Sequence, residues 1–186
     1  MGAVEAIERE RVVAVLRKVE DVARTVDELG LRVVEVTLDS PAALDAIRAL
    51  RERGDVTVLA GTVRTVEEAR AAIDAGAEAV VAPAFVREVV EACRAVGVPA
   101  IPGALTPSEL EQAWRSGAAL VKLFPGRLVG PQYVRDVLAP LADLRLIVTG
   151  GIDTENAVDF LRAGAVAVGV DASRARAVYD VVRLAV

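Results

Sequence analysis

Apolar runs recur along the chain at nearly regular intervals, each introduced by a glycine. The first five of these glycines are Gly30, Gly54, Gly76, Gly97 and Gly117, which are 24, 22, 21 and 20 residues apart. Gly164 follows after 47 residues, about two of these periods. Segments with the spacing of amphipathic helices, such as TVEEARAAIDAG, lie between the runs. The pattern predicts a repeated unit of strand, loop and helix, with the glycine capping the end of the helix.

Eight strands are expected, with helices between them. The strands are expected near residues 12–16, 32–38, 57–61, 79–83, 99–102, 119–124, 145–149 and 165–169. The helices are expected near residues 2–9, 20–29, 41–52, 65–75, 86–96, 106–116, 131–139, 154–163 and 173–185. Thr65, Thr106 and Asp153 fit helix N-caps, and a glutamate three residues after each threonine indicates a capping box.

This order of elements predicts the fold class. The strands are nearly all apolar, which is typical of a parallel sheet covered on both faces. Eight βα units predict an α/β fold, a single (β/α)8 TIM barrel with an extra N-terminal helix, spanning residues 1–186 as one domain. An open doubly wound sheet is the main structural alternative, but eight regular units without a long insertion favour the barrel.

The amino-acid composition argues against several kinds of partner and of catalytic site. A net charge of −5 and only 3% aromatic residues argue against a nucleic-acid partner. No stretch has the length and apolarity of a membrane span and the N-terminus does not resemble a secretory signal, so no membrane partner and a cytoplasmic location are expected. The chain has no histidine, which excludes serine–histidine–aspartate catalysis, and no metal site is expected. The single cysteine, Cys93, is expected to be a buried thiol.

Polar or small residues interrupt the apolar runs at the carboxyl ends of the strands, where the site of such a barrel lies. Two of them are ionisable residues set inside strands, Glu35 in VVEVTL and Lys122 in LVKLFP. Because side chains alternate across a strand, Glu35 shares a face with Thr37, and Lys122 with Phe124. The other candidate residues at these ends are Arg17, Thr62, Pro83, Thr149, Gly150, Gly151 and Gly169.

Lys122 has two interpretations. An apolar environment disfavours an ammonium group, and the free amine can attack a carbonyl and form a Schiff base. Alternatively, the stem of Lys122 packs while its head reaches water, or the residue fills the barrel as an ion pair with Glu35. Buried ion pairs often contribute little net stability once desolvation is counted, so two charges at strand ends favour a functional role.

The stretch TGGIDT at residues 149–154 leads from a strand into a helix. Glycines let backbone N–H groups approach an anion, and the N-terminus of a helix attracts it. The loops after the last two strands form the phosphate site in many barrels. This stretch therefore favours binding of a phosphate or a carboxylate.

Several motifs together resemble one enzyme family over nearly the whole chain. They are VVAVLR (12–17), EVTL (35–38), AGTV (60–63), AP (82–83), IPG (101–103), TPSEL (106–110), VKLFPG (121–126), VGPQYV (129–134) and TGGI (149–152). In this order they resemble the class I aldolases that cleave 2-keto-3-deoxy-6-phosphogluconate and 4-hydroxy-2-oxoglutarate. The resemblance implies an aldolase that needs no cofactor, takes a small keto acid as substrate and forms a homotrimer.

The resemblance also implies roles for individual residues. Lys122 would form the Schiff base with the keto carbon, and Glu35 would be the general acid and base. Thr62 would help to hold the pyruvate carboxylate, while Gly150 and Gly151 would donate N–H groups to the distal anion. Pro83 and Phe124 would shape the pocket.

Two positions depart from the family pattern. Asp39 stands where some members have an arginine that binds the carboxylate, and Arg17 is a candidate to replace it. Asp171, in GVDASRA, stands where a glycine is expected, and an aspartate disfavours a phosphate. These departures favour 4-hydroxy-2-oxoglutarate over a phosphorylated substrate, although Asp171 disfavours its carboxylate too. The alternatives are another phosphate-binding barrel enzyme and a barrel that binds a keto acid without catalysis.

Overall fold

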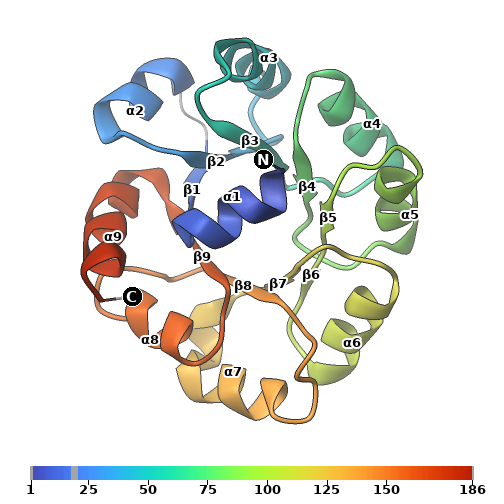
Figure 1. The fold of residues 1–186 in the computed structure, drawn as a ribbon. Coiled ribbons are helices and arrows are strands. Elements are labelled where there is room, and N and C mark those ends of the chain that lie inside the picture. The colour runs from blue at the N-terminus through green and yellow to red at the C-terminus, as the bar shows by residue number, and fades with distance from the viewer. Residues whose placement is uncertain (1, 18–20, 186) are drawn as a thin grey trace.

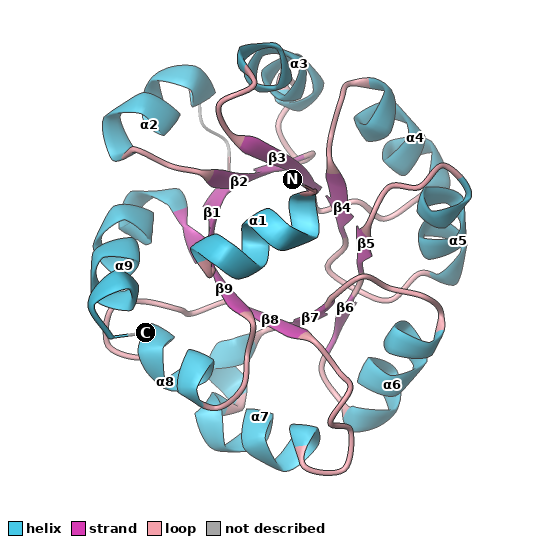
Figure 2. Ribbon diagram, viewed as in Figure 1, coloured by secondary structure: helices cyan, strands magenta, loops and turns pink. Residues whose placement is uncertain are grey.

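Parallel strands form a nearly closed barrel with helices around its outside (Figures 1 and 2). The structure, a computed structural model, describes residues 2–17 and 21–185. The strands are β1 (Val12–Leu16), β2 (Val33–Thr37), β3 (Thr57–Gly61), β4 (Ala79–Val81), β5 (Ala100–Ile101), β6 (Gly103–Ala104), β7 (Val121–Leu123), β8 (Leu146–Thr149) and β9 (Ala167–Asp171). The helices are α1 (Ala3–Glu10), α2 (Val22–Leu29), α3 (Ala43–Arg53), α4 (Val66–Asp74), α5 (Arg87–Ala95), α6 (Pro107–Arg115), η1 (Gly126–Leu128), α7 (Gly130–Leu138), α8 (Ala157–Arg162) and α9 (Ala172–Ala185).

The strand order β5-β4-β3-β2-β1-β9-β8-β7-β6 pairs strands that are neighbours in sequence, except β5 with β6, and pairs the first strand with the last. The strands β5 and β6 are two parts of the fifth expected strand, divided at Pro102, which has no N–H to donate to a ladder. The Pro102 carbonyl still accepts from the Lys122 N–H at 2.8 Å, and the Ile101 carbonyl accepts from the Ala82 N–H at 3.1 Å. Residues 100–104 thus connect the two ends of the sheet, and the predicted (β/α)8 barrel is confirmed.

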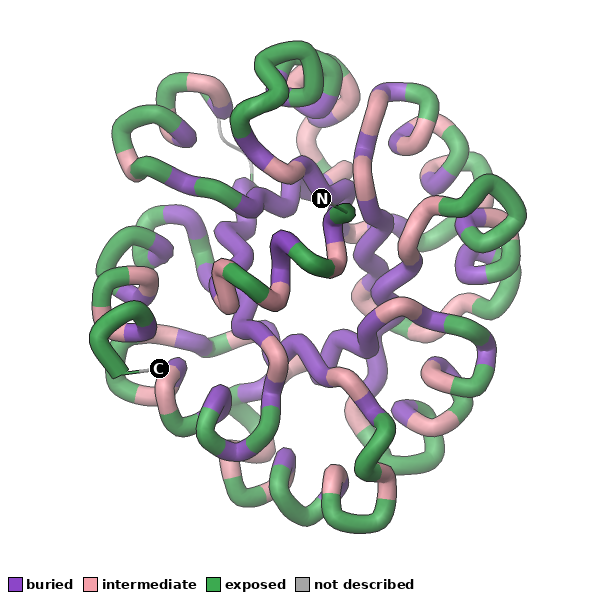
Figure 3. The backbone as a smooth tube through the Cα atoms, in the orientation of Figure 1, coloured by how far each residue is buried: buried purple, intermediate pink, exposed green. Residues whose placement is uncertain are grey.

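The extra N-terminal helix is also confirmed, and its position gives it a role. In Figure 1, α1 lies across the barrel at the amino ends of the strands. Ala3, Ala6 and Ile7 belong to the same buried cluster as the first inward-facing residues of the strands, such as Val13 and Val33. Figure 3 shows the barrel wall and the inner face of α1 as buried. The helix therefore closes one end of the barrel and leaves the carboxyl end for chemistry.

The outer helices pack on the sheet through a second apolar cluster, which includes Cys93. Cys93 is buried as predicted, and burial raises the pKa of its thiol to about 11. Thr65 and Thr106 form the predicted capping boxes at the starts of α4 and α6. The prediction for Asp153 is wrong because residues 154–156 form a turn, and Asn156 is the N-cap of α8.

The end of the last strand also differs from the prediction. We expected it to end at Gly169, but β9 continues to Asp171, which pairs with Val15. Asp171 is exposed, so a polar residue can extend the ladder without being buried. α9 begins at the next residue, Ala172, and no loop separates the two elements. Asp171 therefore stands at the mouth of the barrel.

Candidate active site

A hollow of about 270 Å³ opens at the carboxyl end of the barrel. Nine of the eleven candidate residues line it: Arg17, Thr62, Pro83, Lys122, Phe124, Thr149, Gly150, Gly151 and Gly169. Five lining residues were not among the candidates: Val15, Ile152, Val170, Asp171 and Arg174. Alternation along β1 from Arg17 could have identified Val15, and Asp171 had been noted only as a departure from the family. No sequence signal pointed to Arg174.

Lys122 and Glu35 meet inside the barrel, near the floor of this hollow. Lys122 Nζ lies 3.6 Å from Glu35 Oε1, and the two residues are only 6% and 2% exposed. Glu35 Oε1 is buried and lacks a hydrogen-bond partner among the described residues. Leaving a buried polar atom without a hydrogen bond is costly, so this oxygen is available to a group that a ligand brings.

Gly61 makes room for the Glu35 carboxylate. These residues lie on β3 and β2, and a Cβ atom on Gly61 would stand 2.2 Å from Glu35 Oε1. Real Cβ atoms do not approach another heavy atom so closely. Glycine at this position therefore lets two neighbouring strands hold a carboxylate inside the barrel.

Phe124 lies between the lysine and the glycine loop. Its ring centroid is 5.3 Å from Lys122 Nζ, a distance at which a ring face attracts a cation. On its other side, a Cβ atom on Gly150 would stand 3.0 Å from the ring. The backbone of Gly150 has a φ of +94°, in the range that favours glycine. The ring thus shapes the wall of the hollow beside Lys122.

Thr62 has an unusual backbone conformation. Its φ is +61°, in the left-handed region, which β-branched residues rarely adopt. Strained residues of this kind occur preferentially at ligand-binding and catalytic sites. Thr62 follows the last residue of β3 and lines the hollow, so the strain falls where a ligand would bind.

Arginine–aspartate pairs stand at the rim of the hollow. Arg17 Nη1 lies 3.3 Å from Asp39 Oδ2, and Arg174 Nη1 lies 4.0 Å from Asp153 Oδ2. Asp39 stands where some family members have a carboxylate-binding arginine, and Arg17 was the candidate to replace that arginine. In the structure Arg17 is instead paired with Asp39 itself. The side chain of Arg174 is 61% exposed and that of Arg17 is 50% exposed. Solvent and ligands can therefore reach both guanidinium groups.

Glu35 and Thr37 are the two candidates that do not line the hollow. Glu35 lies next to the hollow, because it contacts Lys122, which lines it. Thr37 is fully buried and its hydroxyl donates to the backbone carbonyl of Leu16 at 3.2 Å. This bond joins β2 to β1, and the placement does not favour a role for Thr37 in substrate binding.

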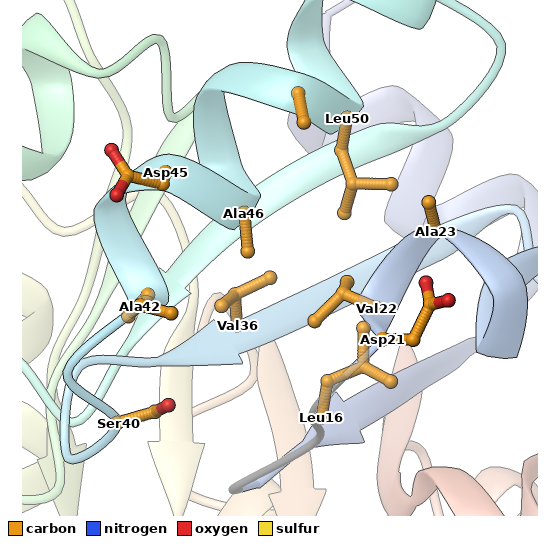
Figure 4. A pocket seen from close by; sticks show the side chains of 12 residues that line it. Leu16, Asp21, Val22, Ala23, Val36, Ser40, Ala42, Asp45, Ala46 and Leu50 are labelled. Carbon is orange, nitrogen blue, oxygen red and sulfur yellow. The ribbon is translucent and has the colours of Figure 1, made fainter.

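A second hollow, of about 240 Å³, lies outside the barrel between α2 and α3 (Figure 4). Its wall is mostly apolar, with Leu16, Val36 and Leu50 beside the polar side chains of Asp21 and Asp45. Its described lining residues include neither a lysine nor a glycine-rich loop. The barrel mouth is therefore the better candidate for the active site.

Two features are lacking in the part of the chain that the structure describes. Within it, no group of three or more histidine, cysteine, aspartate or glutamate side chains is placed to hold a metal ion. Across the same residues, none of the helices combines the length and apolarity needed to cross a membrane.

The fold and this hollow define a class, a (β/α)8-barrel protein with a lysine–carboxylate pair at the mouth of the barrel. The family model described as "Aldolase: KDPG and KHG aldolase" matches residues 4–178. The chain belongs to the KDPG and KHG aldolase family. A 2-dehydro-3-deoxy-phosphogluconate aldolase from Treponema pallidum is 42% identical over 164 residues, which cover 84% of this chain and 78% of the relative.

Solved structures agree with this assignment. The KDPG aldolase from Legionella pneumophila, with pyruvate captured as a covalent carbinolamine intermediate, has a TM-score of 0.81 and 27% identity and covers 91% of this chain and 86% of its own. The 2-keto-3-deoxy-6-phosphogluconate aldolase of Zymomonas mobilis, with 3-phosphoglycerate, has a TM-score of 0.82 and 25% identity, covering 96% and 93% of the two chains.

Proposed function

We propose that this protein is a class I aldolase that reversibly cleaves a 2-keto-4-hydroxy acid to pyruvate and an aldehyde through a Schiff base on Lys122. The observation that supports it best is the buried Lys122 amine, 3.6 Å from Glu35 at the floor of the barrel mouth. The substrates to assay are 2-keto-3-deoxy-6-phosphogluconate and 4-hydroxy-2-oxoglutarate, which release glyceraldehyde 3-phosphate and glyoxylate.

The reaction needs one nucleophile and one group that moves protons. The Lys122 amine adds to the C2 carbonyl to give a carbinolamine, and loss of water gives an iminium ion. Glu35 takes the proton from the C4 hydroxyl while the C3–C4 bond breaks. The electron pair of that bond forms a double bond between C2 and C3, and the electron pair of the C=N bond moves to nitrogen. The resulting enamine is protonated at C3, and hydrolysis releases pyruvate and the free lysine. The iminium is the electron sink for the cleavage.

The remaining lining residues suit the two halves of the substrate. In this proposal Thr62, which lines the hollow, holds the pyruvate carboxylate, and Arg17, which also lines it, is a second candidate for that contact. Pro83 and Phe124, which line the hollow, would shape the pocket around the reacting carbons. The distal group would extend toward the carboxyl ends of β8 and β9, where the lining of the hollow includes Thr149, Gly150, Gly151 and Gly169.

Trapping with borohydride tests the nucleophile. Pyruvate plus borohydride is expected to add a reduced pyruvyl group irreversibly to Lys122, and peptide mapping locates it. Lys18, the only other lysine in the sequence, serves as the internal control and should stay unmodified. Lys122→Arg keeps a positive charge but cannot form the iminium, so loss of both adduct and cleavage is expected. An adduct on Lys18 alone, or none, would reject the mechanism.

Glu35→Gln tests the proton transfer. The variant keeps the shape of the side chain and should lower kcat by about 10²–10⁴-fold, the usual contribution of a general acid or base. A purely structural ion pair predicts instead a loss of stability with little change in kcat. An unchanged kcat in a folded variant would remove Glu35 from this role.

The alternative function is a barrel that binds a keto acid without cleaving it. It predicts pyruvate binding with no turnover of any 2-keto-4-hydroxy acid, whether its distal group is charged or neutral, in a coupled assay for pyruvate. We propose in addition that residues 1–186 act as one catalytic domain, that the protein is cytoplasmic and that it forms a homotrimer. A mean hydropathy of +0.42 supports the last point, because apolar surface in a small chain favours self-association. A monomer mass in light scattering would reject the trimer.

A further inference from the structure

We propose that Asp171 selects against substrates with an anionic distal group, so that the enzyme prefers 2-keto-4-hydroxy acids whose aldehyde half is an uncharged hydroxyaldehyde. The inference rests on the proposed function and specifies the substrate class of that same site. It depends on where the carboxylate stands, on what its two oxygens contact and on the charges around it.

Asp171 is the last residue of β9 and an exposed residue of the hollow. It lies two residues beyond Gly169, so both point to the same side of the strand. Gly150 and Gly151, the candidate anion-binding residues, line the same hollow. The carboxylate therefore borders the space into which the aldehyde half of a substrate extends from Lys122.

The carboxylate of Asp171 already occupies the N-terminus of α9. Asp171 Oδ1 accepts the backbone N–H of Ser173 at 3.0 Å and its hydroxyl at 2.5 Å, which makes Asp171 the N-cap of the helix. A helix N-terminus attracts anions, but here the protein supplies its own. No described residue donates to the second oxygen, Oδ2, which can accept a hydrogen bond from a substrate hydroxyl.

The charges at the rim do not compensate for this carboxylate. Arg17 is paired with Asp39 and Arg174 with Asp153. Two arginines and three aspartates, with Asp171 counted, leave a formal charge of −1. The stem of Arg127 packs against Gly151, but Arg127 does not line the hollow. A phosphate in this position would be repelled, whereas a hydroxyl would be bound.

The test compares 2-keto-3-deoxygluconate with its 6-phosphate as substrates of the full-length protein. The wild type should cleave the unphosphorylated acid with the higher kcat/KM. Asp171→Asn removes the charge and keeps a good N-cap, so the fold is retained. It should raise kcat/KM for the 6-phosphate about tenfold, the size expected for one like charge at close range. It should lower kcat/KM for the unphosphorylated acid, whose hydroxyl loses a charged acceptor, so the two substrates should change in opposite directions. Asp74→Asn, an exposed aspartate at the end of α4, is the matched control and should change neither.

Ionic strength gives a second readout that a merely structural role would not change. Raising the salt from about 20 mM to about 500 mM should increase kcat/KM for the 6-phosphate in the wild type but not in Asp171→Asn, because salt screens the repulsion.

A wild-type preference for the 6-phosphate, or equal effects of Asp171→Asn on both substrates, would overturn the inference. If the pyruvate adduct still forms on Lys122, the proposed function survives that result. Failure of both cleavage and adduct formation would reject the proposed function and the inference together.

Discussion

Single residues at the mouth of the barrel trade stability for binding, and Thr62 is the clearest case. Its φ of +61° costs about 1–3 kcal/mol for a residue other than glycine. Thr62→Gly removes that strain, which stabilises the folded state, but it also raises the conformational entropy of the unfolded chain, which opposes folding. The two effects nearly cancel, so the free energy of unfolding measured in urea should change by no more than about 1 kcal/mol. Since the side chain is lost, kcat/KM should fall about tenfold.

Thr57→Gly is the control for this prediction. Thr57 begins β3 without a positive φ, so the same change should lower the free energy of unfolding and leave kcat/KM unaltered. If Thr62→Gly were strongly destabilising, the backbone at this position would not be strained.

Gly61 shows how much space the Glu35 carboxylate needs. Gly61→Ala places a methyl group 2.2 Å from Glu35 Oε1, so the carboxylate must move away from Lys122. We expect a loss of about 1–3 kcal/mol in stability from overpacking and a fall in kcat of at least about tenfold. Gly2→Ala, where an added Cβ meets nothing within 4 Å, should leave the rate unchanged and lower stability by no more than about 1 kcal/mol, the cost of a poorer N-cap for α1. Unchanged kcat in Gly61→Ala would mean that the position of Glu35 is not critical.

At the scale of the elements, helix starts make stability depend on pH. The N–H groups of Thr106 and Leu105 and the Thr106 hydroxyl hydrogen-bond to Glu109, and they lower the pKa of its carboxyl. A lowered folded-state pKa means that the stabilisation is present above the pKa of the unfolded chain and is lost as pH falls through the folded value. Glu109→Gln should therefore be less stable than the wild type at neutral pH, and the difference should shrink in acid. Urea titrations across this range measure it, with Glu52→Gln on the exposed face of α3 as the control; a difference independent of pH would contradict the assignment.

The strength of the sequence prediction also differs between elements. Helix starts were predictable where a threonine and a glutamate satisfy each other locally, as at Thr106 and Glu109. Strand ends were less predictable, because a strand ends where its hydrogen-bonded partner strand ends, and that partner is far away in sequence. Pro102 divides a strand whose hydrogen bonds nevertheless continue, and β9 extends to Asp171 because Val15 pairs with it. The residues of the site were likewise predictable where the regular strand pattern places them. The predicted barrel allowed Lys122 and Glu35, both set inside strands, to meet across its interior, whereas the rim pairs depend on loops and helix starts.

At the scale of the whole molecule, the two ends of the barrel have separate tasks. The amino end is apolar and closed by α1, whereas the carboxyl end contains the polar residues and the hollow. This division explains why a chain of 186 residues can bury a lysine and a glutamate without losing its core. It also predicts that changes at the closed end alter stability without altering catalysis.

Ile7 tests this separation of the two ends. Its side chain is fully buried among the inward-facing residues of the strands, and Ile7→Ala leaves a cavity there. Such a change costs about 2–5 kcal/mol, which urea unfolding should detect. Because the hollow lies at the other end of the barrel, kcat and KM for the folded variant should stay within about twofold of the wild type. Leu184→Ala, at a residue 90% exposed, is the matched control and should change stability by less than about 0.5 kcal/mol. A parallel loss of kcat in Ile7→Ala would show that the closed end also positions Lys122 and Glu35.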